Sequence, residues 1–89
     1  MTFDPLGAWR LAPQVSLRPE PFGALLYHFG TRRLSFLKTP TMVAVVQGLE
    51  QHPTARAACL DAGVATDELA AYEKALAGLA AASTIVPAG

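Results

Sequence analysis

Hydrophobic residues recur at every second position in the first half of the chain and at every third or fourth position in the second half. Alternation is the pattern of a β-strand with one buried face, whereas the longer spacing is that of an amphipathic helix. Residues 14–18 alternate around Val15 and Leu17, and two prolines then end the run. This segment therefore predicts a short first strand.

Two further alternating runs lie at residues 25–29 and 33–38. They flank a short turn that contains Gly30, which is the sequence pattern of a β-hairpin. With the first strand, this hairpin predicts a three-stranded antiparallel sheet. Its outer face is expected to carry Leu26, His28, Arg33, Ser35 and Leu37. Its core face is expected to carry Leu25, Tyr27, Phe29, Leu34 and Phe36.

Three amphipathic segments follow. Thr39-Pro40 is typical of a helix N-cap followed by proline at the first helical position. A second, short helix is expected at residues 54–62, where Gly63 suits the left-handed position after its end. Thr66 is expected to cap a third helix over residues 67–82. The apolar stripes of the first and third helices are Met42, Val45, Val46 and Leu49, and Leu69, Tyr72, Leu76 and Leu79.

The order of three strands and three helices predicts an α+β fold of winged-helix-like architecture. Residues 1–89 are expected to form a single domain, with residues 1–12 as a loosely ordered lead-in. Trp9 is expected to fasten that lead-in to the body of the domain. Residues 84–87 are expected to pack back as an extended tail.

Composition agrees with a globular protein, because 52% of the 89 residues are hydrophobic and 16% are charged. No apolar run is long enough to span a bilayer, and the first ten residues lack the pattern of a signal peptide. The single cysteine, Cys59, excludes an internal disulfide and is interpreted as a small buried side chain. A soluble, cytoplasmic protein without membrane association is expected.

Catalytic motifs are missing from the sequence. The two histidines, His28 and His52, have no acidic residue or cysteine at metal-ligand spacing, and no phosphate-binding loop or nucleophile elbow occurs. We therefore expect no enzyme activity, no metal and no cofactor. A winged-helix architecture is also typical of DNA-binding proteins. The third helix, however, carries three acidic residues and a single basic one, Lys74, which disfavours contact with phosphates. A small DNA-binding or regulatory protein remains the alternative function.

Charge is distributed unevenly, although the net charge is zero. Residues 1–38 hold five cationic side chains and two carboxylates, which gives this part a net charge of +3. Residues 39–89 hold two cationic side chains and five carboxylates, which gives a net charge of −3. If residues 33–38 form a sheet edge, they could accept an extended peptide as an added strand. Arg32, Arg33 and Lys38 would then favour an acidic peptide. The same charges could equally protect the edge from aggregation, and the residues alone leave both interpretations open.

The stretch "SLRPEPFGALLYHFGTRRLSFLKTPTMVAVV", with "LAAYEKALAGLAA" further on, resembles the mycofactocin biosynthesis chaperone family, MftB. This family belongs to the PqqD-like recognition elements for precursor peptides, and the similarity extends over residues 13–87. The resemblance implies a non-catalytic chaperone with a winged-helix-like fold. Its partners would be an acidic, Glu-rich precursor peptide and a radical S-adenosylmethionine (SAM) maturase that decarboxylates the peptide's terminal tyrosine oxidatively. No nucleic acid and no membrane would be involved.

The resemblance also implies where the peptide binds. Relatives of this kind take the leader peptide as an extra strand, in the cleft between the third strand and the third helix. This favours the functional interpretation of the basic edge over the protective one. The peptide-binding residues expected on this chain are Arg32, Arg33, Leu34, Ser35, Phe36, Leu37 and Lys38 from the strand, and Leu69, Tyr72 and Leu76 from the helix.

Overall fold

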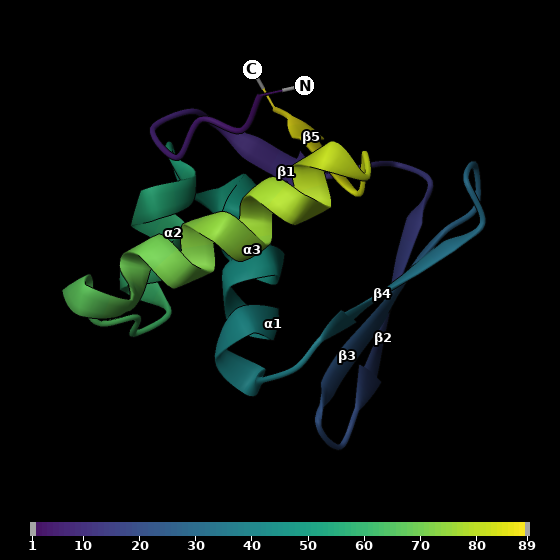
Figure 1. Ribbon diagram of the computed structural model, residues 1–89, viewed down its shortest axis with the longest axis horizontal. Coiled ribbons are helices and arrows are strands. Elements are labelled where there is room, and N and C mark those ends of the chain that lie inside the picture. The colour runs from purple at the N-terminus through teal and green to yellow at the C-terminus, as the bar shows by residue number, and fades with distance from the viewer. Residues whose placement is uncertain (1, 89) are drawn as a thin grey trace.

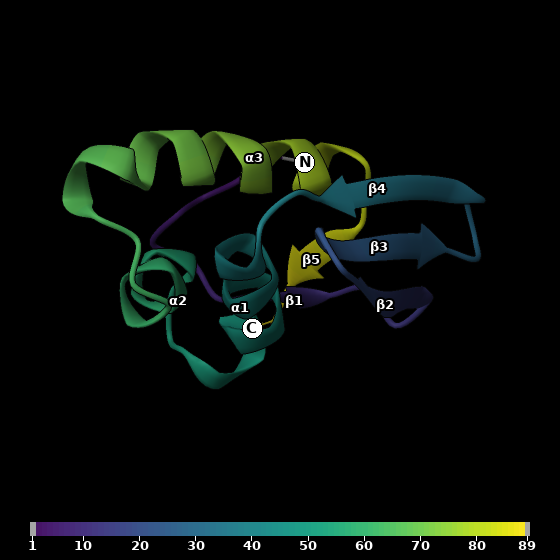
Figure 2. The same ribbon diagram turned by 90° about the horizontal axis from the view of Figure 1, so that it is seen from below.

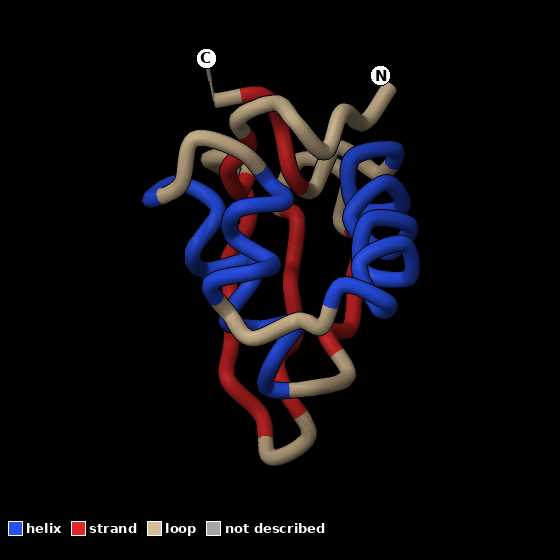
Figure 3. The backbone as a smooth tube through the Cα atoms, turned by 90° about the vertical axis from the view of Figure 1, so that its left-hand side faces the viewer, coloured by secondary structure: helices blue, strands red, loops and turns tan. Residues whose placement is uncertain are grey.

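A computed structural model of the chain describes residues 2–88. These residues form an α+β fold, with the helices on one side and a three-stranded sheet on the other (Figure 1). Viewed from the helical side, the strands lie behind the helices (Figure 3). In chain order the elements are β1 (Trp9–Leu11), β2 (Val15–Glu20), β3 (Gly23–His28), β4 (Arg33–Leu37), α1 (Pro40–Gly48), η1 (Leu49–Gln51), α2 (Ala55–Asp61), η2 (Thr66–Glu68), α3 (Leu69–Ala81) and β5 (Ile85–Pro87).

The three predicted strands pair antiparallel in the order β2-β3-β4. Strand β3 is central: Leu26 lies opposite Leu17 of β2 and opposite Ser35 of β4. Strand β4 is an edge of this sheet, and Figure 2 shows it as the outermost strand. The predicted hairpin and its sheet are therefore confirmed.

The predicted faces of the hairpin were wrong. Leu34 and Phe36, which were expected inside, are 57% and 58% exposed, whereas Leu37 is 2% exposed and lies in the core. On β3 the buried side chains are those of Ala24, Leu26 and His28. Both faces of the hairpin carry large apolar residues, so the alternation gave the period of the strands but not which face is buried.

His28 was expected on the exposed face but is 6% exposed. Its Nδ1 accepts hydrogen bonds from the backbone N–H groups of Gly30 (3.0 Å) and Thr31 (3.1 Å), so the buried ring is satisfied by the turn after β3. A side chain on Gly30 would place its Cβ 2.9 Å from the His28 ring. Gly30 is therefore needed for this close approach, while the positive φ of the turn, 60°, falls on Arg32.

The helices begin and end largely as predicted. The Thr39 side chain accepts from the Met42 N–H, and Gly63 follows α2 with a φ of 93°. The apolar stripe of α1 is buried as expected. Thr66 was wrongly predicted to cap the third helix, because it opens the 3₁₀ turn η2, and α3 begins at Leu69 without a side-chain cap.

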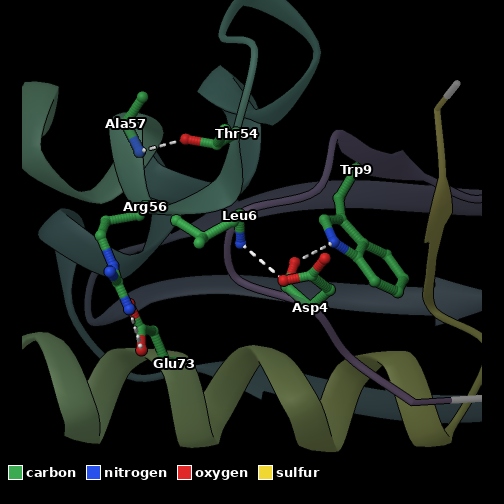
Figure 4. Close-up of polar contacts among 7 residues, drawn as sticks. All are labelled: Asp4, Leu6, Trp9, Thr54, Arg56, Ala57 and Glu73. Atoms are coloured by element: carbon green, nitrogen blue, oxygen red, sulfur yellow. Dashed lines mark hydrogen bonds and ion pairs between the residues drawn. The ribbon is translucent and has the colours of Figure 1, made fainter.

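The segment expected to be a loose lead-in contains a strand. Residues Trp9–Leu11 form β1, which pairs antiparallel with β5 in a second, two-stranded sheet. The tail therefore packs back as predicted, with Leu11 opposite Ile85. Trp9 fastens the segment as expected: it is 3% exposed, and its indole N–H donates to the Asp4 carbonyl at 2.8 Å (Figure 4).

Helices α2 and α3 are joined by an ion pair. The Arg56 Nε and Nη2 donate to the two carboxylate oxygens of Glu73 at 2.8 and 3.3 Å (Figure 4). This two-point contact fixes the relative orientation of both planar groups. It also raises the pKa of Arg56, through the hydrogen bond and then the charge of Glu73.

Two glycines provide a matched test of the fold. A Cβ on Gly23 would overlap the Leu37 carbonyl oxygen, where β4 leads into α1, whereas a Cβ on Gly78 in α3 meets no atom within 4 Å. Gly23→Ala should destabilise the protein by about 1–3 kcal/mol through overpacking. Gly78→Ala should stabilise it by up to about 1 kcal/mol, which corresponds to about 4–8 °C in Tm.

Thermal unfolding followed by circular dichroism measures both effects. A Gly23→Ala protein as stable as the parent would show that close pairing at this junction is not required.

Candidate functional site

A cleft of about 340 Å³ lies between β4 and α3. Its position follows from the fold, because β4 is the edge strand of its sheet and α3 runs at the same level beside it (Figure 2). Strand β4 contributes one wall, α1 the floor and α3 the other wall. The lining residues are Phe36, Leu37, Lys38, Thr39, Met42, Ala71, Tyr72, Ala75 and Leu79.

The outer edge of β4 is open. Among residues 2–88 only β3 pairs with it. In an antiparallel sheet, alternate residues of an edge strand direct their backbone N–H and C=O groups away from the sheet. Phe36 and Leu37 at the end of the strand line the cleft, so an extended segment lying there could form main-chain hydrogen bonds to this part of β4.

The opposite wall is low because its side chains are small. Ala71 and Ala75 are exposed on α3 and lie one turn apart on its cleft side. Tyr72 and Leu79 extend this wall, while Met42 of α1 closes the bottom. The cleft therefore has apolar sides next to an unpaired backbone edge, which suits binding of an extended chain with some hydrophobic side chains.

The structure brings four of the predicted residues to the cleft: Phe36, Leu37, Lys38 and Tyr72. Two predicted helix residues lie elsewhere. Leu76 is fully buried in the core, and Leu69 is half-buried against it. Leu34 and Ser35 belong to β4 but do not line the cleft, and Arg32 and Arg33 lie exposed at the turn end of the strand.

Five lining residues were not predicted. Thr39 and Met42 were interpreted only as a helix cap and a core residue. Ala71 and Ala75 repeat at a four-residue spacing beside Tyr72, which was the available signal for the cleft side of the helix. The fifth is Leu79, which was assigned to the apolar stripe alone.

The cations near β4 have no carboxylate partner within the described range. The three ion pairs found there join Arg18 to Glu20, His52 to Asp61 and Arg56 to Glu73. Lys38 at the cleft, and Arg32 and Arg33 at the turn, are exposed and take part in none of them. Both ends of β4 therefore offer positive charge to an acidic ligand.

The side chains with reactive groups, Cys59 and His52, lie away from the cleft and make contacts within the fold. Cys59 is fully buried, and burial raises the pKa of its thiol, with the charge of Glu73 adding to the effect. The His52 Nδ1 lies 2.7 Å from the Gly48 carbonyl oxygen. Between residues 2 and 88, no three metal-ligating side chains come together and no helix is long and apolar enough to cross a membrane.

Comparison with known proteins places these features in a family. The profile of the "Peptide chaperone MftB family" matches residues 8–86. A peptide chaperone MftB of Mycolicibacterium smegmatis is 59% identical over 87 residues, which cover 98% of this chain and 85% of that protein. The proteins of the same name in Mycobacterium ulcerans and Mycobacterium tuberculosis are 59% and 58% identical over 96% of this chain and 78% of their own length.

No solved structure matches the chain significantly. The relatives are named as chaperones, which is a non-catalytic role, in agreement with the prediction from the sequence. With a family profile that covers nearly the whole chain and relatives near 59% identity, the chain belongs to the peptide chaperone MftB family.

Proposed function

We propose that the chain binds the mycofactocin precursor peptide by strand addition to β4 and presents it to a radical SAM maturase. The proposal rests on one observation above all: a cleft in a peptide chaperone is bordered by an open strand edge. Main-chain pairing at such an edge fixes the direction and register of a bound peptide. We take residues 1–89 as a single PqqD-like, winged-helix-like domain that acts in the cytoplasm.

The chemistry of the cleft supports an acidic, partly apolar peptide. Lys38 lies at the cleft, and Arg32 and Arg33 lie on the same edge strand and its turn. Phe36 and Tyr72 provide aromatic surface on opposite walls. A bound leader would hold the reactive end of the peptide at a high effective concentration near the maturase, without a catalytic group on the chaperone itself.

Peptide binding is tested by calorimetry with the Glu-rich precursor peptide, beside a gel-shift experiment with duplex DNA. Saturable peptide binding and an unshifted duplex are expected. A DNA shift without peptide binding would instead support the alternative, a small winged-helix regulatory protein. The acidic residues Asp67 and Glu68 in η2, directly before α3, already argue against DNA, because their charges would repel phosphates.

The cleft itself is tested by filling it. Ala75→Trp places a bulky side chain on the α3 wall and should weaken peptide binding at least tenfold, or by about 1.4 kcal/mol. Ala70→Trp is the matched control, because Ala70 is exposed on the same helix but does not line the cleft. Equal peptide affinities for the two variants would contradict binding between β4 and α3.

The basic turn is tested by reversing its charge. Arg32→Glu/Arg33→Glu should slow association with the acidic peptide and reduce the dependence of the rate on salt, because long-range attraction mainly sets on-rates. Stopped-flow measurements at several salt concentrations give both quantities. Lys74→Glu reverses one charge on α3 and shows the effect of a charge reversal away from the turn. An unchanged affinity of the double variant at low salt would rule out steering by these arginines.

A further inference from the structure

The outer face of the three-stranded sheet carries large apolar side chains that the described chain leaves uncovered. Phe29, Leu34 and Phe36 are 60%, 57% and 58% exposed, and Phe22 in the turn before β3 is 46% exposed. No helix or strand lies beyond this face in Figure 1 or Figure 2. The core uses only the opposite face of the sheet.

These side chains form one continuous patch, which we call the outer sheet face. Strand register places Tyr27 opposite Leu34, and Leu25 opposite Phe36. The Tyr27 and Phe29 rings meet edge to face at 5.1 Å, and the Phe22 and Phe36 rings lie 6.3 Å apart. A shallow hollow of about 290 Å³ lies on this patch. Its lining is Ser16, Arg18, Leu25, Tyr27, Phe29 and Leu34.

The apolar character of this face is not explained by the stability of the chain alone. A one-sided antiparallel sheet normally carries polar residues on its open face, and β2 follows that rule with Ser16 and Arg18. Strands β3 and β4 do not follow it. A contiguous exposed patch of aromatic and aliphatic side chains marks an interaction surface, since burial of such residues dominates the binding energy of protein interfaces.

The charges around the patch select the kind of partner. Its rim carries Arg18, whose side chain is 80% exposed, and the exposed Arg32 of the turn between β3 and β4. The carboxylate at this rim is that of Glu20, whose side chain is 27% exposed and lies 3.6 Å from Arg18. If a second copy packed face to face on this patch, the excess positive charge of one rim would lie opposite the excess positive charge of the other. A different protein with an apolar centre and an acidic rim is the complementary partner.

Phe36 connects this face to the cleft. Its side chain belongs to the apolar patch and also lines the wall between β4 and α3. A protein docked on the outer sheet face would therefore lie beside a peptide held in the cleft, in contact with the same residue. That position suits the enzyme that must act on the peptide.

We propose that the outer sheet face is the docking surface for the peptide-modifying enzyme, whose matching surface has an apolar centre with acidic residues around it. The inference deepens the proposed function and rests on it. Apart from Phe36, docking and peptide binding use different residues, so substitutions at the other positions should affect each of them separately.

The experiment compares two double variants of the full chain. Phe29→Gln/Leu34→Gln removes apolar area from the outer sheet face without touching the cleft. Leu6→Gln/Leu60→Gln removes two leucines that are 62% and 47% exposed elsewhere, and serves as the control. Calorimetry measures binding to the purified radical SAM maturase, and separately to the precursor peptide. Circular dichroism verifies that each variant is folded.

We expect Phe29→Gln/Leu34→Gln to weaken maturase binding at least tenfold while peptide affinity stays within twofold of the parent. The control should bind both ligands as the parent does. Unchanged maturase binding by the sheet variant, or no maturase binding by the parent, overturns the inference. A parent that is dimeric in sedimentation and becomes monomeric only in the sheet variant overturns it too, since a second copy would then cover the face. Failure of the parent to bind peptide would instead refute the proposed function.

Discussion

The close approach of Gly23, at the start of β3, to the Leu37 carbonyl at the end of β4 is the constraint on which the rest of the structure depends. Because Gly23 has no side chain, the Leu37 carbonyl can lie where a Cβ would otherwise be. This contact comes at the last residue of β4, two residues before Thr39 caps α1. The strand can therefore turn directly into the helix, and the Leu37 side chain enters the core at the point where sheet and helices meet.

That junction also places the cleft. Helix α1 begins at the end of β4, so Met42 in its first turn closes the bottom of the space beside the strand. Helix α3 is held on the far side by the Arg56–Glu73 pair and by the β1–β5 sheet that follows it. The edge of β4 is left uncovered between these fixed elements. Natural edge strands are usually protected, so an open edge beside an apolar cleft is better explained by use than by stability.

The period of each element could be predicted from the sequence, but the burial of the hairpin faces could not. Leu25, Tyr27, Phe29, Leu34 and Phe36 are larger and more hydrophobic together than Ala24, Leu26, His28, Ser35 and Leu37, yet the second set faces the core. A rule that buries the larger apolar set assumes that an isolated chain minimises its own exposed apolar area. That assumption would not hold if one face were kept for a partner, as we propose for the outer sheet face.

Other features depended on contacts between distant residues. Strand β1 comprises the three residues Trp9–Leu11, and its pairing partner β5 lies more than seventy residues later in the chain. The basic residues of the turn were readable from the local pattern, whereas the edge position of β4 was a condition of the hypothesis and is given by the order of the strands in the sheet. The cleft lining was not predicted, because the four-residue spacing of Ala71 and Ala75 beside Tyr72 is a weak signal in a helix that is already rich in alanine. The hydrophobic pattern of a sequence identifies side chains that pack into a core. It does not identify a groove, which forms where the side chains along one wall are small.

Strand β4 contributes to three surfaces because successive groups on it point in different directions. Leu37 faces the core, the open backbone edge faces the cleft, and Leu34 faces away from both. Phe36 reaches two of these surfaces, so an occupant of either one would change its surroundings. A peptide that orders the Phe36 ring would prepare the outer sheet face for the enzyme, and the enzyme would favour the bound peptide by the same amount, because coupling between two ligands is reciprocal. If both proposals hold, the edge strand would link loading of the peptide to recruitment of the enzyme that modifies it.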